Sequence, residues 1–357
     1  MKKYTAPLLA LILTLAAAVA ARAAGTLDIY WTDTEGGVGT LIVTPAGESV
    51  LIDTGNPSRP GQTDTSAARI HKAAVAAGVS KIDHLILTHF HNDHYGGAAE
   101  LARLMPIGAV LDNGIPDHDS DGVTNRDAQF ARDIQPYRDM AAGSRSVMQV
   151  GQVIPLKQSS NAAPLTFYCV GARKQYMVPA NAPSNAVCSE GVQHAADTTD
   201  NANSIVMLLK FGPFKFFVGA DLTWDMEAKL VCPYNPVGTV DVFQVDHHGL
   251  NPSNNPLLVR SLTPTVSVVS NGPRKGPDAE ILATLRSVPS IQTMWQIHKN
   301  LRGTNNVNTE DQYIANLAAN CAGNCIKCSV DPSGQTYTIS IPATGVSKTY
   351  ATVLNKP

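Results

Sequence analysis

The sequence carries little charge and almost no imbalance between the two signs. Charged residues make up 16% of its 357 positions, and the formal net charge is −2. This balance excludes a global basic field that would attract nucleic acid, although a local patch remains possible. The low charged fraction argues against disorder, and the 44% hydrophobic content suits a soluble protein with a large core.

Long apolar runs are absent beyond the first twenty residues. The one early run, Pro7–Ala20, follows the positive segment Lys2–Lys3 and precedes an A-x-A pattern at residues 21–23. The run is shorter than the ~20 residues that a membrane-spanning helix needs. We therefore expect a signal peptide over residues 1–23, with export to the periplasm or the extracellular space and no membrane attachment after cleavage.

Cysteine is scarce, with six residues in the chain. An even number in an exported protein predicts disulfides, with 15 connectivities open to six cysteines. Three of them, Cys321, Cys325 and Cys328, lie close together near the C-terminus. A zinc knuckle is the alternative for these three, but no histidine lies near them in the sequence.

The pattern along the chain is β-rich, helical, β-rich and helical again, which predicts an α/β fold of two mixed sheets with helices outside. We expect one domain over residues 24–357, because neither repeats nor a clear linker divide it. Residues from about 115 to 203 read as an irregular insertion, and residues from about 311 to 357 as a Cys-rich extension. The expected strands include Leu27–Trp31, Ser49–Asp53, Ile82–Leu87, Ser204–Phe211, Phe214–Gly219 and Val240–Val245.

The strongest chemical signal is the segment Thr88–Gly97, THFHNDHYGG, which directly follows a hydrophobic strand. His89 and His91 are two residues apart, so both imidazoles can turn to one side of an extended loop. Asp93 and His94 follow as the chain bends toward a helix. Imidazole and carboxylate are ligands for zinc and similar divalent metals. Ten histidines in the whole chain make such a cluster improbable by chance.

The pattern H-x-H-x-D-H after a buried strand resembles the signature of the metallo-β-lactamase superfamily. Three further segments resemble that family's motifs in order: Leu51–Gly55 (LIDTG), Gly219–Asp221 (GAD) and Asp246–Gly249 (DHHG). The resemblance implies a four-layer αββα sandwich. It also implies that Asp53 braces the metal loop and that Asp221 bridges two metals.

The spacing of the later motifs is similar to that of the hydrolase domain of bacterial competence DNA-uptake proteins and of related phosphorylcholine esterases. Two segments depart from the competence pattern. Asp33–Gly37 (DTEGG) stands where those domains tend to have D-V-G-Q-G-D, and Asn271–Gly276 (NGPRKG) where they tend to have His-Pro. A nuclease activity is therefore not carried over.

By resemblance, His89 and His91 bind a first metal, and Asp93 and His94 a second. One of His247 and His248 completes the second site. We assign His247 as the ligand and His248, with Asp93, to proton transfer, but the sequence leaves this choice open. The third ligand of the first metal is Asp200 or His194, with Asp200 favoured. Two zinc ions are expected, with manganese or iron as alternatives, and they would lower the pKa of a shared water toward ~7.

Weaker signals surround this motif set. Asp117, Asp119, Asp121 and Gly122 resemble the start of a calcium loop, but position twelve is Ala128 rather than Glu, which favours a solvated loop. Candidate pocket residues are His194, His298, Arg274 and Lys275. Arg274 and Lys275 would suit an anionic substrate, although paired charges in a turn are usually solvated.

These features predict an exported metal-dependent hydrolase acting on a phosphoester or phosphodiester. A lactam, lactone or thioester hydrolase of the same fold is the alternative. A metal-binding module without catalytic activity is an alternative from a different functional class, although every metal motif is intact. The expected partner is a small-molecule or ester substrate. The sequence leaves the oligomeric state open.

Overall fold

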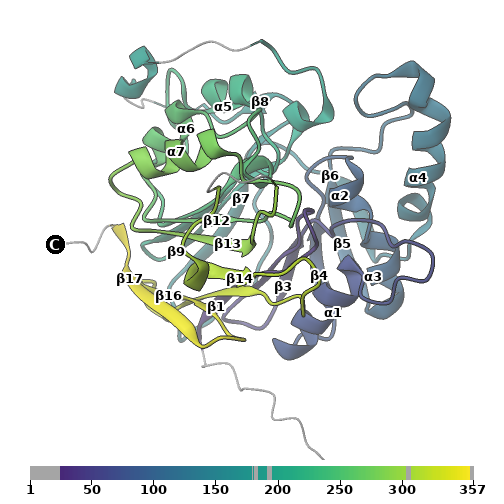
Figure 1. Ribbon diagram of the computed structural model, residues 1–357, viewed down its shortest axis with the longest axis horizontal. Helices are drawn as coiled ribbons and strands as arrows, with labels where there is room; N and C mark the ends of the chain where they lie inside the picture. The colour runs from purple at the N-terminus through teal and green to yellow at the C-terminus, as the bar shows by residue number, and fades with distance from the viewer. Residues whose placement is uncertain (1–24, 179, 181–183, 191–194, 303–306, 354–357) are drawn as a thin grey trace, which may run out of the picture.

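Two β-sheets packed face to face form the centre of the computed structural model, and helices cover both outer faces (Figure 1). The structure describes residues 25–178, 180, 184–190, 195–302 and 307–353, so the predicted signal peptide and His194 lie outside the described residues. The four-layer αββα architecture predicted from the sequence is confirmed. Within the described residues, no helix has the length and hydropathy to cross a membrane.

The first sheet has nine strands, in the spatial order β17-β16-β15-β1-β2-β3-β4-β5-β6. β3, β4, β5 and β6 run parallel, and the other neighbours in this sheet pair antiparallel. The strand bounds are β1 Leu27–Trp31, β2 Thr40–Val43, β3 Ser49–Ile52, β4 Ile82–Ile86, β5 Ile107–Asp112, β6 Ser144–Val147, β15 Ile326–Val330, β16 Thr336–Ile341 and β17 Val346–Ala351.

The second sheet has eight strands, in the order β14-β13-β12-β11-β10-β9-β7-β8. β10 to β14 run parallel, and β9 joins β10 through a hairpin around Gly212. The strand bounds are β7 Leu165–Ala172, β8 Gln175–Tyr176, β9 Val206–Phe211, β10 Phe214–Val218, β11 Val242–Gln244, β12 Val266–Val269, β13 Thr293–His298 and β14 Ile314–Asn316.

The main hydrophobic core lies between the two sheets. Trp31 of the first sheet meets Phe216 of the second edge-on, with ring centroids 5.5 Å apart. Along β1 and β10, every second side chain packs into this core, as expected where one face of each sheet is turned toward the other sheet. Burying each of these large side chains stabilises the fold by roughly 1.5–3 kcal/mol, so the sandwich is a rigid support for the loops at its edge.

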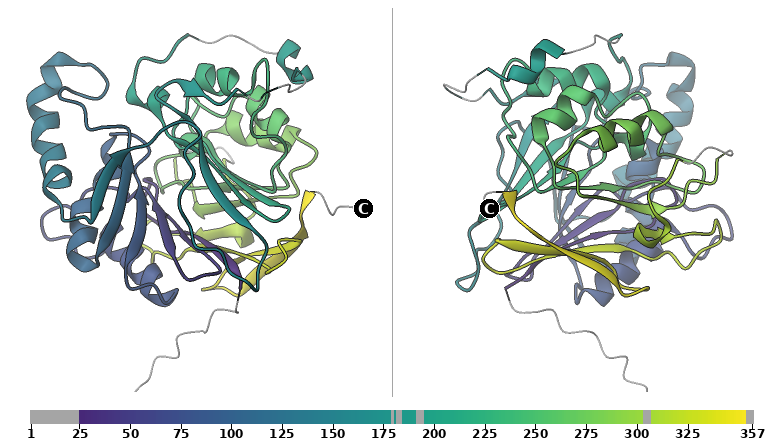
Figure 2. Two further views of the ribbon diagram at one scale, coloured as in Figure 1. Left: turned by 180° about the vertical axis from the view of Figure 1, so that it is seen from behind. Right: turned by 60° about the vertical axis from the view of Figure 1, so that its left-hand side comes forward.

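The outer faces are covered by two groups of helices (Figure 2). On the first sheet lie α1 Ser66–Ala76, α2 Asn92–Tyr95, α3 Ala98–Leu104 and α4 Asp127–Asp139. On the second sheet lie α5 Trp224–Val231, α6 Pro256–Leu262 and α7 Ala279–Ser287. Short 3-10 turns are η1 Thr124–Arg126, η2 Ala186–Glu190, η3 Asp200–Asn203, η4 Asp246–Gly249 and η5 Asp311–Tyr313.

Residues 115–203 are more regular than predicted, because they contain α4 and β7. In α4, Phe130, Ile134 and Tyr137 recur at helical spacing and are buried, so the helix packs through a narrow apolar stripe in an otherwise polar segment. Strands β15 to β17 likewise extend the first sheet through pairing with β1. The C-terminal segment is thus part of the sandwich.

The prediction that the cysteines are paired is correct for one disulfide only, Cys188–Cys232. The other four cysteines are unpaired thiols, and two of them, Cys169 and Cys328, lie in the core between the sheets. Burial raises the pKa of Cys169 to about 12. The core positions supply hydrophobic packing rather than covalent links.

We therefore expect four cysteines to react with a thiol reagent in unreduced protein unfolded in denaturant and chelator, and six after reduction. Mass spectrometry of the alkylated chain counts them directly. Cys169→Ser is expected to destabilise the fold, whereas Cys188→Ser should raise the unreduced count to five. Two or no labelled cysteines in the unreduced wild type would show that further disulfides form.

Candidate metal centre

The motif residues gather at one edge of the sandwich because strands that precede them end there. In the first sheet, parallel strands β3 and β4 end just before Asp53 and Thr88. In the second sheet, parallel strands β10 and β11 end just before Gly219 and Asp246, respectively. Since the carboxyl ends of parallel strands meet at the same sheet edge, two distant stretches of sequence are brought face to face.

The turns after these strands are tight and use left-handed backbone conformations. Four non-glycine residues there have positive φ: Asp53 (58°), Ala220 (58°), His247 (50°) and His248 (56°). Such conformations cost of order 1–3 kcal/mol each and tend to persist where surrounding contacts fix them, commonly at functional sites. The backbone conformation of these turns therefore directs their side chains toward one another at this edge of the sandwich.

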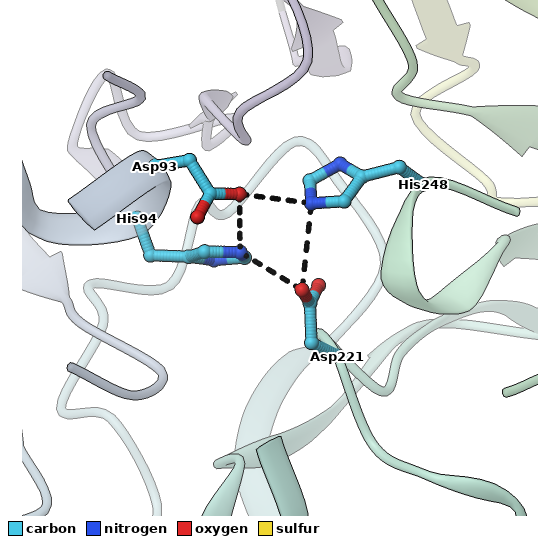
Figure 3. A group of neighbouring side chains, drawn as sticks. All are labelled: Asp93, His94, Asp221 and His248. Atoms are coloured by element: carbon cyan, nitrogen blue, oxygen red, sulfur yellow. Dashed lines mark ion pairs between the residues drawn. The ribbon is translucent and has the colours of Figure 1, made fainter. Parts of the chain in front are cut away.

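Four side chains form a compact cluster: Asp93, His94, Asp221 and His248, whose ligand atoms all lie within 4.8 Å of one another (Figure 3). His94 Nε2 is 3.2 Å from Asp221 Oδ2 and 3.3 Å from Asp93 Oδ2. His248 Nε2 is 3.1 Å from Asp93 Oδ2 and 3.4 Å from Asp221 Oδ2. Asp93 and His94 lie in α2, and Asp221 and His248 lie in the turns that follow β10 and β11.

Each imidazole near the cluster is oriented through its other nitrogen. His94 Nδ1 bonds to Asp53 Oδ2 at 2.8 Å, and His248 Nδ1 to the backbone oxygen of Ser270 at 2.8 Å. His89 Nδ1 lies 3.1 Å from the Thr88 hydroxyl. These contacts hold the Nε2 atoms toward the cluster, as partners of metal-binding histidines commonly do.

Asp53 lies where the family resemblance implies a bracing residue. Its Oδ1 accepts a hydrogen bond from the Thr88 backbone N–H at 2.8 Å, and its Oδ2 accepts one from the Thr88 hydroxyl and contacts His94. The side chain is completely buried. Asp53 thus connects the end of β3 to both ends of the histidine loop.

The donor atoms fit divalent cations. Buried Nε2 atoms of His89, His94 and His248, together with Asp221 Oδ1, have no hydrogen-bond partner in the described structure. Unpartnered buried polar atoms are costly, and cations bound beside these atoms would satisfy them. Imidazole nitrogen and carboxylate oxygen are also the ligand types that zinc, manganese and iron accept.

The pKa values of the histidines and aspartates in the cluster depend strongly on one another. Burial lowers the pKa of His94, but Asp221, Asp93 and Asp53 outweigh it and raise that pKa well above its usual range. Burial likewise raises the pKa of Asp221, but His94, His248 and His247 hold it well below its usual range. The histidines and carboxylates of the cluster therefore stabilise one another's charged forms.

The structure places the two late histidines differently. His248, not His247, belongs to the four-residue cluster. His247 points its Nδ1 to the Ser253 hydroxyl at 3.1 Å, and its Nε2 is 3.6 Å from Asp221 Oδ2. The reason is the pair of consecutive left-handed residues, which sends the two rings in different directions and could not be foreseen from sequence.

The carboxylate beside His91 is Asp121 rather than Asp200. His91 Nε2 is 2.8 Å from Asp121 Oδ1. The oxygens of Asp200 instead accept hydrogen bonds from the Phe90 backbone N–H at 2.6 Å and from the Asn203 amide at 2.9 Å. Asp121 comes from the loop that resembles a calcium site, and the one signal that could have singled it out was the density of aspartates there.

The remaining pocket candidates separate into three cases. Lys275 Nζ lies 2.5 Å from Asp93 Oδ2, at the border of the cluster. Arg274 is exposed, and among the described residues it makes neither a hydrogen bond nor an ion pair with the cluster. His298 is completely buried and lies against Asp33 and Cys321 instead of lining the metal site.

Residues 33–157 match the model of the metallo-β-lactamase superfamily. Recombination protein 2 of Haemophilus influenzae is 26% identical over 258 residues, 71% of this chain and 26% of that protein. An atrochrysone carboxyl ACP thioesterase of Aspergillus terreus is 37% identical over 84 residues, 24% of this chain and 23% of that protein. The chain thus spans about a quarter of the length of these curated relatives.

A solved structure of a variant of the β-hydroxylase CmlA aligns with a TM-score of 0.44 and 15% identity, over 76% of this chain and 52% of that chain. The fold assignment is based on the two sheets and the order of motifs along them. Residues 33–157 are thus similar to the metallo-β-lactamase superfamily, and the two sheets and the order of motifs along them agree with that likeness.

Proposed function

We propose that the chain is an exported hydrolase that holds two divalent cations, zinc in preference to manganese or iron, and cleaves a phosphoester or phosphodiester. Asp93, His94, Asp221 and His248 would hold the second cation. His89 and His91 would hold the first, with Asp121 as the nearest additional carboxylate. Such cations, when bound, lower the pKa of a water molecule and stabilise negative charge on the substrate.

The observation that favours a phosphate substrate is the position of Lys275. Its ammonium group borders the cluster, 2.5 Å from Asp93, and its side chain is 33% exposed, so it can meet a ligand from solvent. If Asp93 held a cation, its carboxylate would share its charge with that cation, and Lys275 would be available to contact an anionic substrate group. A phosphoryl oxygen would then lie between the lysine and the metal centre.

His247 is the chain's own candidate for contact with substrate beside the cluster. Burial lowers the pKa of His247 to about 4, so its imidazole is neutral at neutral pH and can form a hydrogen bond to substrate. Ser253 holds the ring through Nδ1, and Nε2 points toward the Asp221 side of the cluster. We assign His247 to substrate binding and His248 to metal binding.

Lys275→Gln should lower kcat/KM for bis(4-nitrophenyl) phosphate by about tenfold, since a hydrogen bond to a charged group contributes roughly 1.5–3 kcal/mol at most. The effect on neutral 4-nitrophenyl acetate should be small. Arg274→Gln, next in sequence but exposed, is the matched control and should change neither rate. Equal losses on both substrates in Lys275→Gln would show that the lysine does not select for phosphate.

A thioester or lactone hydrolase is the second candidate, because a relative of 37% identity over 84 residues is named a thioesterase. Assays of one purified preparation with both kinds of substrate distinguish the two candidate functions. Hydrolysis of the phosphodiester without hydrolysis of a chromogenic thioester or cephalosporin supports the first. The opposite preference would make the substrate a carboxylic ester or amide. Nucleic acid is the less favoured phosphodiester, because the net charge is −2.

A further inference from the structure

A second group of metal-ligand side chains lies outside the catalytic cluster: Asp33, His298 and Cys321. Asp33 follows β1, His298 ends β13, and Cys321 lies between β14 and β15. Their ligand atoms lie within 4.8 Å of one another, and the structure describes no other such group apart from the catalytic one. The fold therefore brings a histidine to Cys321 from 23 residues away.

The three donor atoms converge. Cys321 Sγ is 3.1 Å from Asp33 Oδ2 and 3.6 Å from His298 Nε2. His298 Nε2 is 3.9 Å from Asp33 Oδ2. Asp33 and His298 are completely buried, and Cys321 is partly exposed, so a cation could enter from the cysteine side.

The histidine is already oriented as a ligand. Asn271 binds both backbone groups of His298, through Oδ1 at 3.1 Å and Nδ2 at 2.7 Å. His298 Nδ1 lies 3.3 Å from the Lys299 backbone oxygen, which makes it the protonated nitrogen. Nε2 is then left with a lone pair that faces the thiol.

The charge balance around the group favours a cation. Arg69 is buried and is paired with Asp33 at 2.9 Å, Glu35 at 3.1 Å and Asp64 at 2.6 Å. Three carboxylates thus surround one guanidinium, and Lys72 lies near enough to lower the pKa of Asp64 further. A dication bound to a Cys321 thiolate would offset the negative charge that Arg69 leaves uncompensated.

We propose that Asp33, His298 and Cys321 form an additional zinc site, distinct from the catalytic centre. Sulfur, imidazole nitrogen and carboxylate oxygen are together a zinc-type ligand set, with the fourth position left to solvent. Binding would release the thiol proton to solvent and form a zinc–sulfur bond. The site would join the loop after β1 to the C-terminal segment, and that loop touches the catalytic centre through the hydrogen bond from Val38 N to the Asp93 backbone oxygen at 3.2 Å.

Cobalt substitution tests the proposal without measuring hydrolysis. The proposed catalytic ligands are histidines and aspartates, so only the additional site can give a thiolate-to-cobalt charge-transfer band in the near ultraviolet. We expect this band in the cobalt-loaded wild type and its loss in Cys321→Ser. Cys325→Ser, four residues along the chain and outside the group, is the matched control and should keep the band.

Metal analysis of the zinc form gives the second readout. Cys321→Ser should contain one zinc fewer per chain than the wild type, and His298→Gln provides the same test if the serine variant does not fold. Asp221→Asn should keep the thiolate band even if it loses catalytic metal, so failure of the proposed function and failure of this site are distinguishable. Absence of the band, equal zinc content in wild type and Cys321→Ser, or a disulfide at Cys321 would overturn the proposal.

Discussion

Asp221→Asn is expected to fold normally, to bind the second cation weakly and to lose hydrolytic rate by about a hundredfold or more. The side chain is 1% exposed, and its Oδ2 lies 3.2 to 4.0 Å from an Nε2 atom of each of four histidines. Asparagine keeps the shape but removes the negative charge on which they converge. A loss of this size is comparable to removing a major electrostatic contributor to a transition state.

The measurement combines metal content, circular dichroism and turnover of bis(4-nitrophenyl) phosphate. Asp225, in the helix that follows Asp221, is a poor control because its side chain is only 10% exposed and accepts hydrogen bonds from Thr223 and Asp197. Asp139→Asn, exposed at the end of α4 where it accepts a hydrogen bond from Gln135, should change nothing. If Asp221→Asn retains both metals and near-normal turnover, Asp221 is structural.

His248→Asn is expected to have the second large effect, again about a hundredfold in rate together with loss of bound metal. Its Nε2 is buried without a hydrogen-bond partner and lies within 3.4 Å of both Asp93 and Asp221. Asparagine is too short to reach the same point while keeping the hydrogen bond to Ser270. The loss of this ligand should therefore lower the metal content per chain as well as the hydrolytic rate.

His247→Asn is the matched comparison, since the two histidines are neighbours in one tight turn. It should keep its metal content and lose about tenfold in rate, as expected for one hydrogen-bonding group. Inductively coupled plasma mass spectrometry on both variants decides between them. Metal loss in His247→Asn with full metal content in His248→Asn would restore the assignment made from sequence.

The fold was predictable where the hydrophobic pattern of a segment agreed with the turn residues at its ends. Leu27–Trp31 was predicted to the residue as β1, and the expected strands Ser204–Phe211 and Phe214–Gly219 correspond to β9 and β10 within two residues at each end. Helix α4 was missed because three apolar residues at helical spacing are sparse in a polar stretch. The registry of β15 with β1, 299 residues apart at Ile29 and Cys328, depends on tertiary pairing that local sequence does not encode.

The site was predictable as a set of motifs but not as a set of contacts. The histidine loop, Asp53 and Asp221 could be found because each follows a hydrophobic strand and parallel strand ends meet. The choice between His247 and His248 depended on two left-handed residues. The approach of Asp121 to His91, and of Cys321 to His298, depended on loops whose path is set by packing rather than by their own sequence.

The central claim is that hydrolysis by this chain depends on cations held at the His89–His94 loop and Asp221. The most direct measurement is turnover of bis(4-nitrophenyl) phosphate by protein stripped with a chelator, then titrated with zinc, in the Cys321→Ser background to remove the additional site. The account predicts no turnover in the stripped protein and recovery that saturates at about two zinc ions per chain. Undiminished turnover by protein shown to be free of metal would contradict it.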